Sequence, residues 1–249
     1  MRSIIHAGGE STRLKEIYDG PKALAPIDGM PLLWYHLQPL LKSKMIDEFV
    51  FTLRHHHDRV QSYAESLGIN AKFVVEKSKL GRAGSIRQGI EEGKIDVNEA
   101  YLMSHPDDLI PIDVKALLDY SQEALRKGKA AVMVMSRYHV NPFGIGVAES
   151  KGSMLELRHF KEKPEMPLID NHYANTGMIL LLPEAMKEFK KSPLDRMTHP
   201  EFEIMPRLVA ANKVAVFLVD RWLPINYSSE YKDALAMGKE NILEYLKSG

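Results

Sequence analysis

Apolar positions along the chain follow two spacings, one typical of buried strands and one typical of amphipathic helices. Short runs that are almost continuously apolar predict strands at residues 2–7, 48–54, 71–76, 100–104, 130–136 and 214–219. Apolar residues three and four positions apart predict helices at residues 31–44, 57–67, 81–92, 113–127, 183–191 and 201–212. Alternating strands and helices imply right-handed crossovers and a mostly parallel sheet flanked by helices, with ligands at the carboxyl ends of the strands.

The pattern changes after Asn141, where apolar runs follow one another with few helices between them. These runs predict short strands at residues 143–148, 154–161 and 174–182. An amphipathic stretch at 229–247 predicts a closing helix. We therefore expect one Rossmann-like α/β domain over 1–249 that includes a small β subdomain.

The first predicted strand runs directly into a loop of small, hydroxylated and basic residues. These residues are Ala7, Gly8, Gly9, Ser11, Thr12 and Arg13. Lys22 follows nine positions after Arg13, directly behind a proline. Glycine amides that a ligand can approach closely, together with two cations, suit phosphate oxygens. Many α/β proteins hold nucleotide phosphates with a strand, a glycine-rich loop and a helix in this order.

This run resembles the nucleotide-binding signature of the sugar-phosphate nucleotidylyltransferases, Gly-Gly-x-Gly-Thr-Arg-Leu followed by Pro-Lys and Pro-Leu. Ser11 stands at the third glycine of that signature. Residues 76–85 are similar to the family stretch Glu-x-x-x-Leu-Gly-Thr-Ala-Gly, which packs against the nucleoside. The resemblance implies a nucleotide site formed by the loop residues named above with Lys22, Glu76, Gly81, Ala83 and Gly84.

Two carboxylates end the predicted strand at 100–104, and Asp107 matches the metal-binding aspartate of the family. Carboxylate oxygens are hard ligands that Mg²⁺ prefers, so the resemblance implies Mg²⁺ as the cofactor. Many members carry a second metal aspartate where this chain has Pro224, and we expect the amide oxygen of Asn226 to replace it. Asp107 and Asp108 could instead cap the turn before the next helix.

Later motifs match the sugar-binding half of the same family. Phe143-Gly144, Glu162-Lys163-Pro164 and Asn175-Thr176-Gly177 occur in the order that the family shows. The resemblance implies sugar-phosphate contacts from Gly144, Glu162, Lys163, Asn175 and Gly177. It also implies that residues 1–140 bind mainly nucleotide and 141–228 mainly sugar phosphate, with 229–249 as the closing helix.

The implied reaction is in-line attack of a sugar 1-phosphate on the α-phosphorus of an NTP, which yields an NDP-sugar and pyrophosphate. In this reaction Lys163 would hold the attacking phosphate. Lys22 and a Mg²⁺ on Asp107 and Asn226 would steady the α-phosphate. Arg13 would take the departing phosphates.

Composition narrows the remaining choices. Equal numbers of basic and acidic residues, 33 of each, give no net charge that would favour nucleic acid or an acidic membrane as a partner. Absence of cysteine excludes disulfides and thiolate chemistry. No apolar run is long enough to span a membrane, and the first strand leaves no room for a signal peptide, so we expect a cytoplasmic protein. Assembly into a homo-oligomer is compatible with the sequence.

Two alternatives stay open. A related nucleotidyltransferase could use another phosphorylated acceptor, although the Glu162-Lys163-Pro164 motif favours a sugar phosphate. A homologue that binds nucleotide sugars without catalysis is the second alternative, and Pro106 and Pro224 beside the expected metal ligands are its support.

Overall fold

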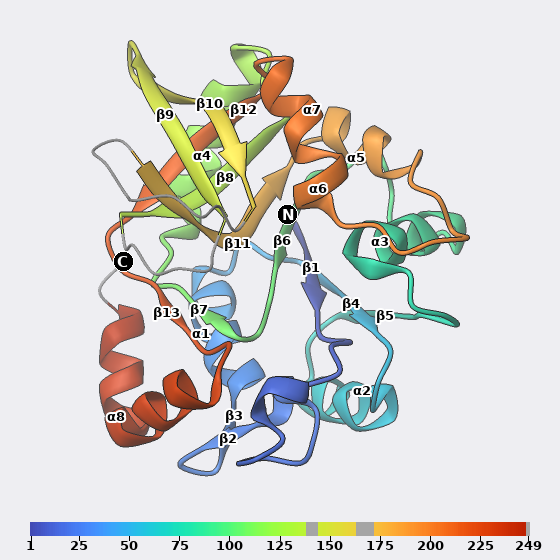
Figure 1. Ribbon diagram of the computed structural model, residues 1–249, viewed down its shortest axis with the longest axis vertical. Coiled ribbons are helices and arrows are strands. Elements are labelled where there is room, and N and C mark those ends of the chain that lie inside the picture. The colour runs from blue at the N-terminus through green and yellow to red at the C-terminus, as the bar shows by residue number, and fades with distance from the viewer. Residues whose placement is uncertain (138–143, 163–171, 248–249) are drawn as a thin grey trace.

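A single sheet of nine strands runs through the middle of the molecule (Figure 1). The structure is a computed structural model that describes residues 1–137, 144–162 and 172–247. The strands of the sheet are β1 (Arg2–His6), β4 (Glu48–Leu53), β5 (Ala71–Val75), β6 (Tyr101–Ser104), β8 (Ala131–Ser136), β9 (Ile145–Lys151), β10 (Met154–Lys161), β11 (His172–Leu181) and β12 (Val214–Val219). Their order across the sheet is β5-β4-β1-β6-β11-β8-β12-β10-β9.

The sheet is mixed, but seven of its nine strands share one direction. β11 pairs antiparallel with β6 and β8, and β10 pairs antiparallel with β12 and β9. The other neighbours in this order pair in parallel. The predicted α/β class is therefore confirmed. The strands expected in the β subdomain join the same sheet, because β9 pairs with both β10 and β11.

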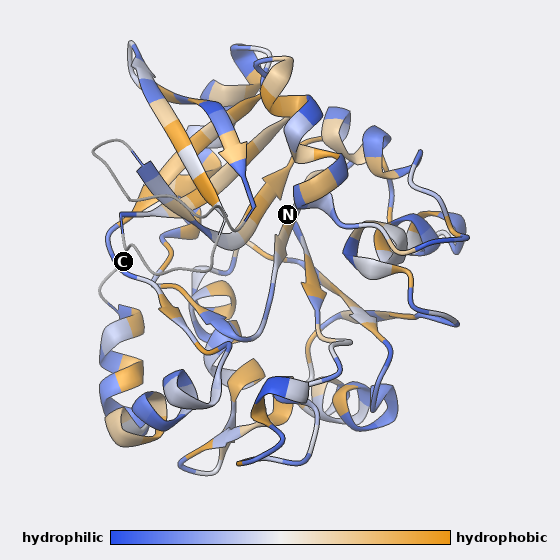
Figure 2. Cartoon of the chain, viewed as in Figure 1, coloured by the Kyte–Doolittle hydropathy of each residue, from blue (hydrophilic) through white to orange (hydrophobic). Residues whose placement is uncertain are grey.

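Helices cover both faces of the sheet. They are α1 (Leu32–Ser43), α2 (His57–Ser66), α3 (Gly81–Glu91), α4 (Val114–Arg126), α5 (Pro183–Phe189), α6 (Pro200–Glu203), α7 (Met205–Ala210) and α8 (Ser228–Lys247). Successive strand residues point to opposite faces. Ile4 therefore packs in one apolar cluster with α3, α5 and α7, whereas Ile5 packs in another with α1, α2 and α4. Figure 2 shows the apolar residues concentrated along the central strands. No described helix is both long and apolar enough to cross a membrane.

Two predicted helices are interrupted. The segment predicted at 201–212 divides into α6 and α7, where Pro206 provides no backbone N–H for a continuous helix. The closing helix is broken at Gly238, whose φ of 72° and ψ of 169° are not helical. At this break the N–H of Lys239 donates to the Asp28 carboxylate at 2.7 Å. The Asp28 carboxylate, which lies in a distant loop, therefore caps the part of α8 that follows Gly238.

The shortest elements are not predicted by the apolar pattern, because two or three residues carry no periodicity. They are the 3-10 turns η1 (Thr12–Leu14) and η2 (Lys22–Leu24) and the strands β2 (Pro26–Ile27), β3 (Met30–Pro31), β7 (Asp108–Leu109) and β13 (Leu223–Pro224). β2 pairs with β3, and β7 pairs with β13. The second pair carries residues of the site described below.

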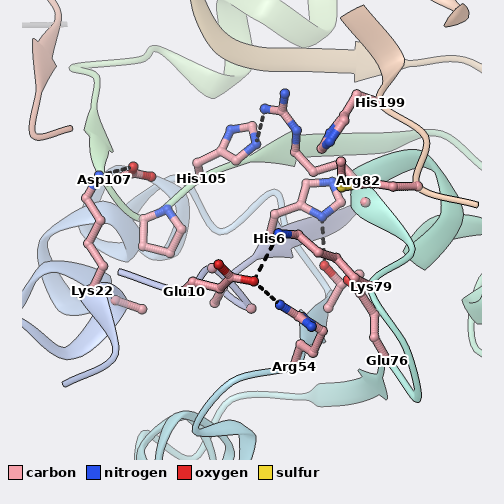
Figure 3. Close-up of a pocket in the computed structure, with 18 residues that line it drawn as sticks. His6, Glu10, Lys22, Arg54, Glu76, Lys79, Arg82, His105, Asp107 and His199 are labelled. Atoms are coloured by element: carbon pink, nitrogen blue, oxygen red, sulfur yellow. Dashed lines mark hydrogen bonds and ion pairs between the residues drawn. The ribbon is translucent and has the colours of Figure 1, made fainter. Parts of the chain in front are cut away.

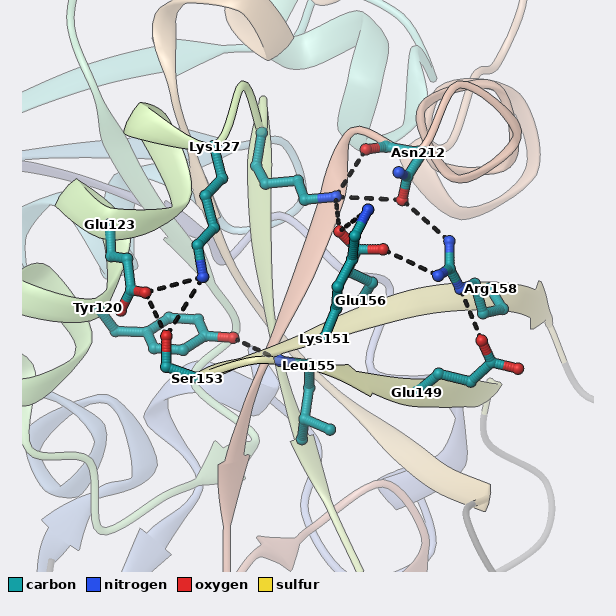
Figure 4. A network of polar contacts seen from close by, with 11 residues as sticks. Tyr120, Glu123, Lys127, Glu149, Lys151, Ser153, Leu155, Glu156, Arg158 and Asn212 are labelled. Atoms are coloured by element: carbon teal, nitrogen blue, oxygen red, sulfur yellow. Dashed lines mark hydrogen bonds and ion pairs between the residues drawn. The ribbon is translucent and has the colours of Figure 1, made fainter.

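A network of charged side chains lies around β10 and Asn212 (Figure 4). Lys129 and Glu156 have side chains that are only 2% and 5% exposed. The Lys129 ammonium donates to Glu156 Oε1 at 2.9 Å, and to the backbone and side-chain oxygens of Asn212 at 2.9 and 3.1 Å. These three bonds use all the donors of an ammonium group. The Lys129 ammonium is therefore fully bonded within the protein, and the other oxygen of Glu156 lies 3.0 Å from the Arg158 guanidinium, so the cluster is structural.

Replacement of this lysine should destabilise the fold. Lys129→Met leaves the buried Glu156 carboxylate without its closest cation, and we expect a loss of about 3 kcal/mol in the free energy of unfolding. Urea denaturation of the variant and the wild type measures this difference. Lys127→Met, which removes an exposed lysine paired with Glu123, should cost less than about 0.5 kcal/mol. Equal stability of the two variants would contradict the structural role.

Candidate active site

Two adjoining cavities open at the carboxyl ends of β1, β4 and β6. Their volumes are about 330 Å³ and about 230 Å³. Arg82, His105 and Asp107 line both cavities, so the two spaces share a wall. In Figure 3 the first cavity has Lys22 and Asp107 at one end and Glu76 at the other. This is the edge of the sheet where an α/β protein is expected to bind its ligands.

The glycine-rich loop borders the first cavity. The Ala7 N–H donates to the Thr52 carbonyl at 3.0 Å, which fixes the start of the loop beside β4. A Cβ on Gly8 would lie 2.7 Å from the backbone nitrogen of Arg54, so only glycine fits there. A Cβ on Gly9 would meet no heavy atom of the described residues within 4 Å. Gly8 therefore allows close packing on β4, and Gly9 leaves the loop backbone open to a ligand.

Ser11 connects this loop to the turn that carries Lys22. Its φ of 56° is left-handed, a conformation that favours glycine. The Ser11 hydroxyl accepts a hydrogen bond from the backbone N–H of Lys22 at 2.6 Å. This hydrogen bond offsets part of the cost of the left-handed backbone that serine adopts where the family signature has glycine.

Lys22, Asp107 and Asn226 come from three separate segments and meet beside both cavities. The Lys22 ammonium donates to Asp107 Oδ2 at 2.5 Å and to Asn226 Oδ1 at 3.4 Å. Burial raises the pKa of Asp107, but the charge of Lys22 outweighs it and holds the pKa below its usual value. Two oxygen ligands therefore converge on one position that already holds a positive charge.

A two-stranded sheet sets the relative positions of Asp107 and Asn226. β7 and β13 are antiparallel, so Pro224 lies opposite Asp108. The N–H of Ile225 donates to the Asp107 carbonyl at 2.8 Å. Pro224 is buried in this sheet and has no side-chain ligand to offer. Asn226 lies two residues further along and lines the second cavity.

The second cavity is lined by the predicted sugar-phosphate residues that the structure describes. The N–H of Asn175 donates to the Gly144 carbonyl at 2.7 Å, and its side-chain oxygen accepts from the N–H of Gly177 at 3.0 Å. Gly177 has a φ of 80°, and a Cβ there would lie 3.0 Å from Asp108 Oδ2. A Cβ on Gly144 would lie 2.5 Å from Glu162 Oε2. Both glycines therefore keep space for neighbouring carboxylates.

Arg82 and two histidines form much of the wall between the cavities. The Arg82 guanidinium donates to the buried Glu201 carboxylate at 2.7 Å and to His105 Nε2 at 2.9 Å. The rings of His6 and His105 stack with centroids 5.4 Å apart. Burial, followed by the charge of Arg82, lowers the pKa of His105 well below its usual value. The wall therefore presents one cation and neutral imidazoles at pH 7.

The sequence matches the nucleotidyl transferase family over residues 2–234. The chain belongs to this family. The family resemblance drawn from the sequence motifs is thereby confirmed.

Sequence relatives of the chain are longer than it is, and a solved structure has the same fold. A Sulfolobus acidocaldarius protein provisionally assigned as a mannose-1-phosphate guanyltransferase is 28% identical over 236 residues, which cover 93% of this chain and 61% of that protein. The D-glycero-alpha-D-manno-heptose 1-phosphate guanylyltransferase of Campylobacter jejuni is 36% identical over 120 residues, 47% of this chain and 52% of that protein. The chain thus spans only 52% to 61% of these relatives. The inositol-1-phosphate CTP transferase of T. maritima superposes with a TM-score of 0.73 at 18% identity, over 100% of this chain and 96% of that one, which confirms the fold.

The two cavities divide most of the predicted residues into the two predicted sets, with Arg13 as the exception. Six of the predicted nucleotide-binding residues line the first cavity, namely Ala7, Gly8, Gly9, Lys22, Glu76 and Gly81. Four of the predicted sugar-phosphate residues line the second cavity, namely Gly144, Glu162, Asn175 and Gly177. Asp107 lines both and Asn226 lines the second. Lys163 lies outside the described residues.

Some residues predicted to bind the nucleotide do not line the first cavity. Ala83 is buried and its N–H donates to the Thr198 carbonyl at 3.1 Å, so the start of α3 packs on that segment. A Cβ on Gly84 would lie 2.8 Å from the Leu80 side chain. Arg13 lines the second cavity, with its guanidinium carbon 5.0 Å from the centroid of the Tyr227 ring. Ser11 and Thr12 line neither cavity, and the Ser11 hydroxyl contacts the turn of Lys22 instead.

Three residues of the shared wall and its surroundings are absent from the sequence-based site. Arg82 stands where the family stretch has threonine, and this departure is the signal that could have identified it. His105 gives no such signal, because a single histidine before a turn is usually a structural residue that packs against its neighbours. Asp108 accepts from the indole N–H of Trp222 at 2.9 Å. Burial and the charge of Asp107 raise the pKa of Asp108 well above its usual value.

Proposed function

We propose that the chain transfers a nucleotidyl group from an NTP to a sugar 1-phosphate and releases pyrophosphate. The observation that carries this proposal is the meeting of the two cavities at Asp107. A nucleotide beside the glycine loop and a sugar phosphate beside Glu162 would bring their phosphates together at this point. Both named curated relatives are enzymes of this kind by name, which supports the same class of acceptor.

The reaction forms one bond and breaks one. An oxygen of the sugar 1-phosphate attacks the α-phosphorus, and the bond to the β-phosphate oxygen breaks as pyrophosphate leaves. No general base is required, since a phosphate monoester with a second pKa of about 6 is largely dianionic at neutral pH. The protein's contribution is therefore positioning and charge neutralisation.

The cations of the site suit these tasks. Lys22 lies where the two cavities meet and would contact the α-phosphate. Arg13 lines the second cavity rather than the first, and its role as the partner of the departing phosphates stays a prediction from the family resemblance. Lys163 stays the predicted partner of the attacking phosphate. Arg82 offers a further positive charge in the shared wall.

Asp107 and Asn226 would hold a Mg²⁺ ion. Both oxygens already converge on one cation, the ammonium of Lys22, and they are hard ligands. In the described part of the chain, no three His, Cys, Asp or Glu side chains are grouped around a metal position. This fits Mg²⁺, which proteins often hold through one or two side chains and substrate phosphates. When bound, the ion would neutralise charge on the reacting phosphates.

Pyrophosphate release tests this function. The wild-type protein is incubated with Mg²⁺, each of ATP, GTP, CTP, UTP and dTTP, and a panel of sugar 1-phosphates and of phosphorylated acceptors that are not sugars. We expect release with at least one pair, and mass spectrometry should identify the NDP-sugar. Release only with a phosphorylated acceptor that is not a sugar would change the assigned acceptor. A folded protein that releases no pyrophosphate with any acceptor would favour the non-catalytic alternative.

We also propose a cellular location and an oligomeric state for the protein. A protein that uses NTPs would act in the cytoplasm, and cell fractionation tests this prediction. Homo-oligomer formation also stays a prediction, and light scattering of the purified protein measures it.

A further inference from the structure

Arg82 is the one lysine or arginine among the described residues that lines both cavities (Figure 3). Its side chain is 30% exposed, so the guanidinium is accessible to a ligand. The family stretch has threonine at this position, which is shorter and carries no charge. A contact between Arg82 and a substrate would therefore be a feature of this chain and not of the signature.

The packing of α3 fixes the backbone on both sides of Arg82. Gly81 has a φ of 73°, and a Cβ there would collide with the carbonyl oxygen of Thr198. The N–H of Ala83 donates to the same carbonyl at 3.1 Å, and the N–H of Thr198 donates to the Leu80 carbonyl at 2.8 Å. The Arg82 side chain therefore extends from a fixed point at the start of α3.

Two contacts orient the guanidinium of Arg82. The Glu201 carboxylate accepts from it at 2.7 Å, and the Glu201 side chain is only 2% exposed. His105 Nε2 accepts from it at 2.9 Å. A carboxylate buried to this extent needs a hydrogen-bonded cation, so Glu201 holds the guanidinium firmly. The group is thus oriented before any substrate binds.

Arg82 keeps unused hydrogen-bonding capacity in this position. A guanidinium has five N–H donors, and the contacts with Glu201 and His105 use two of them. The other three have no hydrogen-bond partner in the part of the chain that the structure describes. Because the donors of a guanidinium form a planar fork, they match the oxygens of a phosphate group. The wall between the cavities therefore presents a group suited to phosphate.

The direction of attack indicates which phosphate this is. Under the proposed function, the sugar 1-phosphate lies in the second cavity and the nucleotide lies in the first. In-line displacement places the attacking and the departing oxygen on opposite sides of the α-phosphorus. The departing pyrophosphate therefore lies away from the second cavity, whereas the attacking phosphate lies beside the wall that the cavities share.

A cation in this wall also opposes the repulsion between the two substrates. The attacking phosphate and the α-phosphate are both negatively charged, and their reacting atoms must come within about 3.5 Å of each other. Charges of the same sign repel strongly at this distance in a partly buried site. A guanidinium that contacts the attacking phosphate reduces this repulsion and makes the close approach possible.

We propose that Arg82 binds the attacking phosphate of the sugar 1-phosphate and holds it against the α-phosphate of the nucleotide. The proposal rests on the nucleotidyl transfer proposed above and adds a substrate contact that the family signature lacks. Arg82 transfers no proton and forms no covalent bond in this role. Glu201 is a positioning residue, since it acts on the phosphate through the guanidinium.

Two variants separate this substrate contact from a purely structural ion pair. Arg82→Lys keeps a cation for Glu201 but loses the fork of donors. The double variant Arg82→Gln/Glu201→Gln removes both charges, so no buried carboxylate is left without a cation. Arg87→Gln, which breaks the ion pair with Glu91 on the same helix, is the matched control. Circular dichroism and melting temperatures show whether each variant is folded.

Calorimetry on the intact proteins measures binding separately from turnover. The ligands are the panel of sugar 1-phosphates, the matching free sugars and the five NTPs. We expect the wild type to bind at least one sugar 1-phosphate about tenfold or more tightly than the free sugar. In both Arg82 variants the Kd for that sugar 1-phosphate should rise about tenfold. The Kd for the free sugar and for the NTPs should stay within about twofold of the wild-type value, as all values should in Arg87→Gln.

Steady-state release of pyrophosphate gives a second measurement. In the double variant we expect the KM for the sugar 1-phosphate to rise about tenfold and kcat to fall about 10²-fold, with the KM for the NTP unchanged. A residue that only stabilises the fold would change the constants of both substrates together. If the double variant does not fold, the separation of the two KM values in Arg82→Lys decides the question.

The outcomes distinguish this inference from the proposed function. Folded Arg82 variants with the wild-type Kd and KM for the sugar 1-phosphate would overturn the inference and leave the transfer intact. A weaker affinity for the NTP, alone or together with that for the acceptor, would overturn it as well. Wild-type protein that neither binds nor uses any sugar 1-phosphate would overturn the proposed function, and this inference with it.

Discussion

Lys22→Ala is expected to lower kcat by about 10²–10³-fold. The ammonium of Lys22 lies beside Asp107 and Asn226 where the two cavities meet, and it is held there before any substrate binds. Removal of one preorganised charge contact in an active site typically costs this much in rate. Steady-state release of pyrophosphate with the best pair of substrates measures the loss.

Lys42→Ala is the matched control, because it removes an exposed lysine from α1. It should leave kcat and the melting temperature unchanged. Circular dichroism of the Lys22 variant should match the wild type, since Lys22 lies at the cavity rather than in the core. A folded Lys22→Ala protein with wild-type kcat would remove this residue from the proposed mechanism.

Asp107→Asn is expected to cause a loss of similar size, about 10²–10³-fold in kcat, because it removes the one anionic ligand of the proposed metal pair. The change keeps the shape of the side chain and removes its charge. The variant should also need a higher Mg²⁺ concentration to reach half of its maximal rate. Titration of Mg²⁺ at saturating substrates measures both effects.

Two further variants test whether the effect belongs to this position. Asp119→Asn changes an exposed aspartate on α4 and should behave like the wild type. Asn226→Ala removes the neutral partner and should weaken the response to Mg²⁺ less than Asp107→Asn does. Equal Mg²⁺ dependence in the wild type and Asp107→Asn would contradict a metal on Asp107.

Much of the fold follows from the sequence, since long apolar runs and periodic helices carry strong local signals. The strands at Met154–Lys161 and Val214–Val219 have the predicted boundaries in the structure. The glycine loop and the two carboxylates that follow β6 also lie at the expected edge of the sheet. Each of these features depends on residues that are neighbours in the chain.

Features that depend on distant segments could not be predicted in the same way. The pairing of β7 with β13 joins residues more than a hundred positions apart, and each strand is only two residues long. The contact between Arg82 and Glu201 spans 119 positions. Ala83 and Gly84 match the family stretch, but the structure uses them to pack α3 on the segment around Thr198. Motif order alone does not distinguish packing from ligand contact.

The ion pair between Lys22 and Asp107 has a consequence for the order of events at the site. As long as the ammonium neutralises Asp107, a metal ion must compete with it for the same carboxylate. A nucleotide phosphate that draws Lys22 toward itself leaves Asp107 with uncompensated charge, which strengthens its attraction for another cation. By thermodynamic linkage the metal must then favour nucleotide binding by the same factor. The resting protein is thus electrically balanced at this point, and under the proposed function the nucleotide and the metal would bind as interdependent partners.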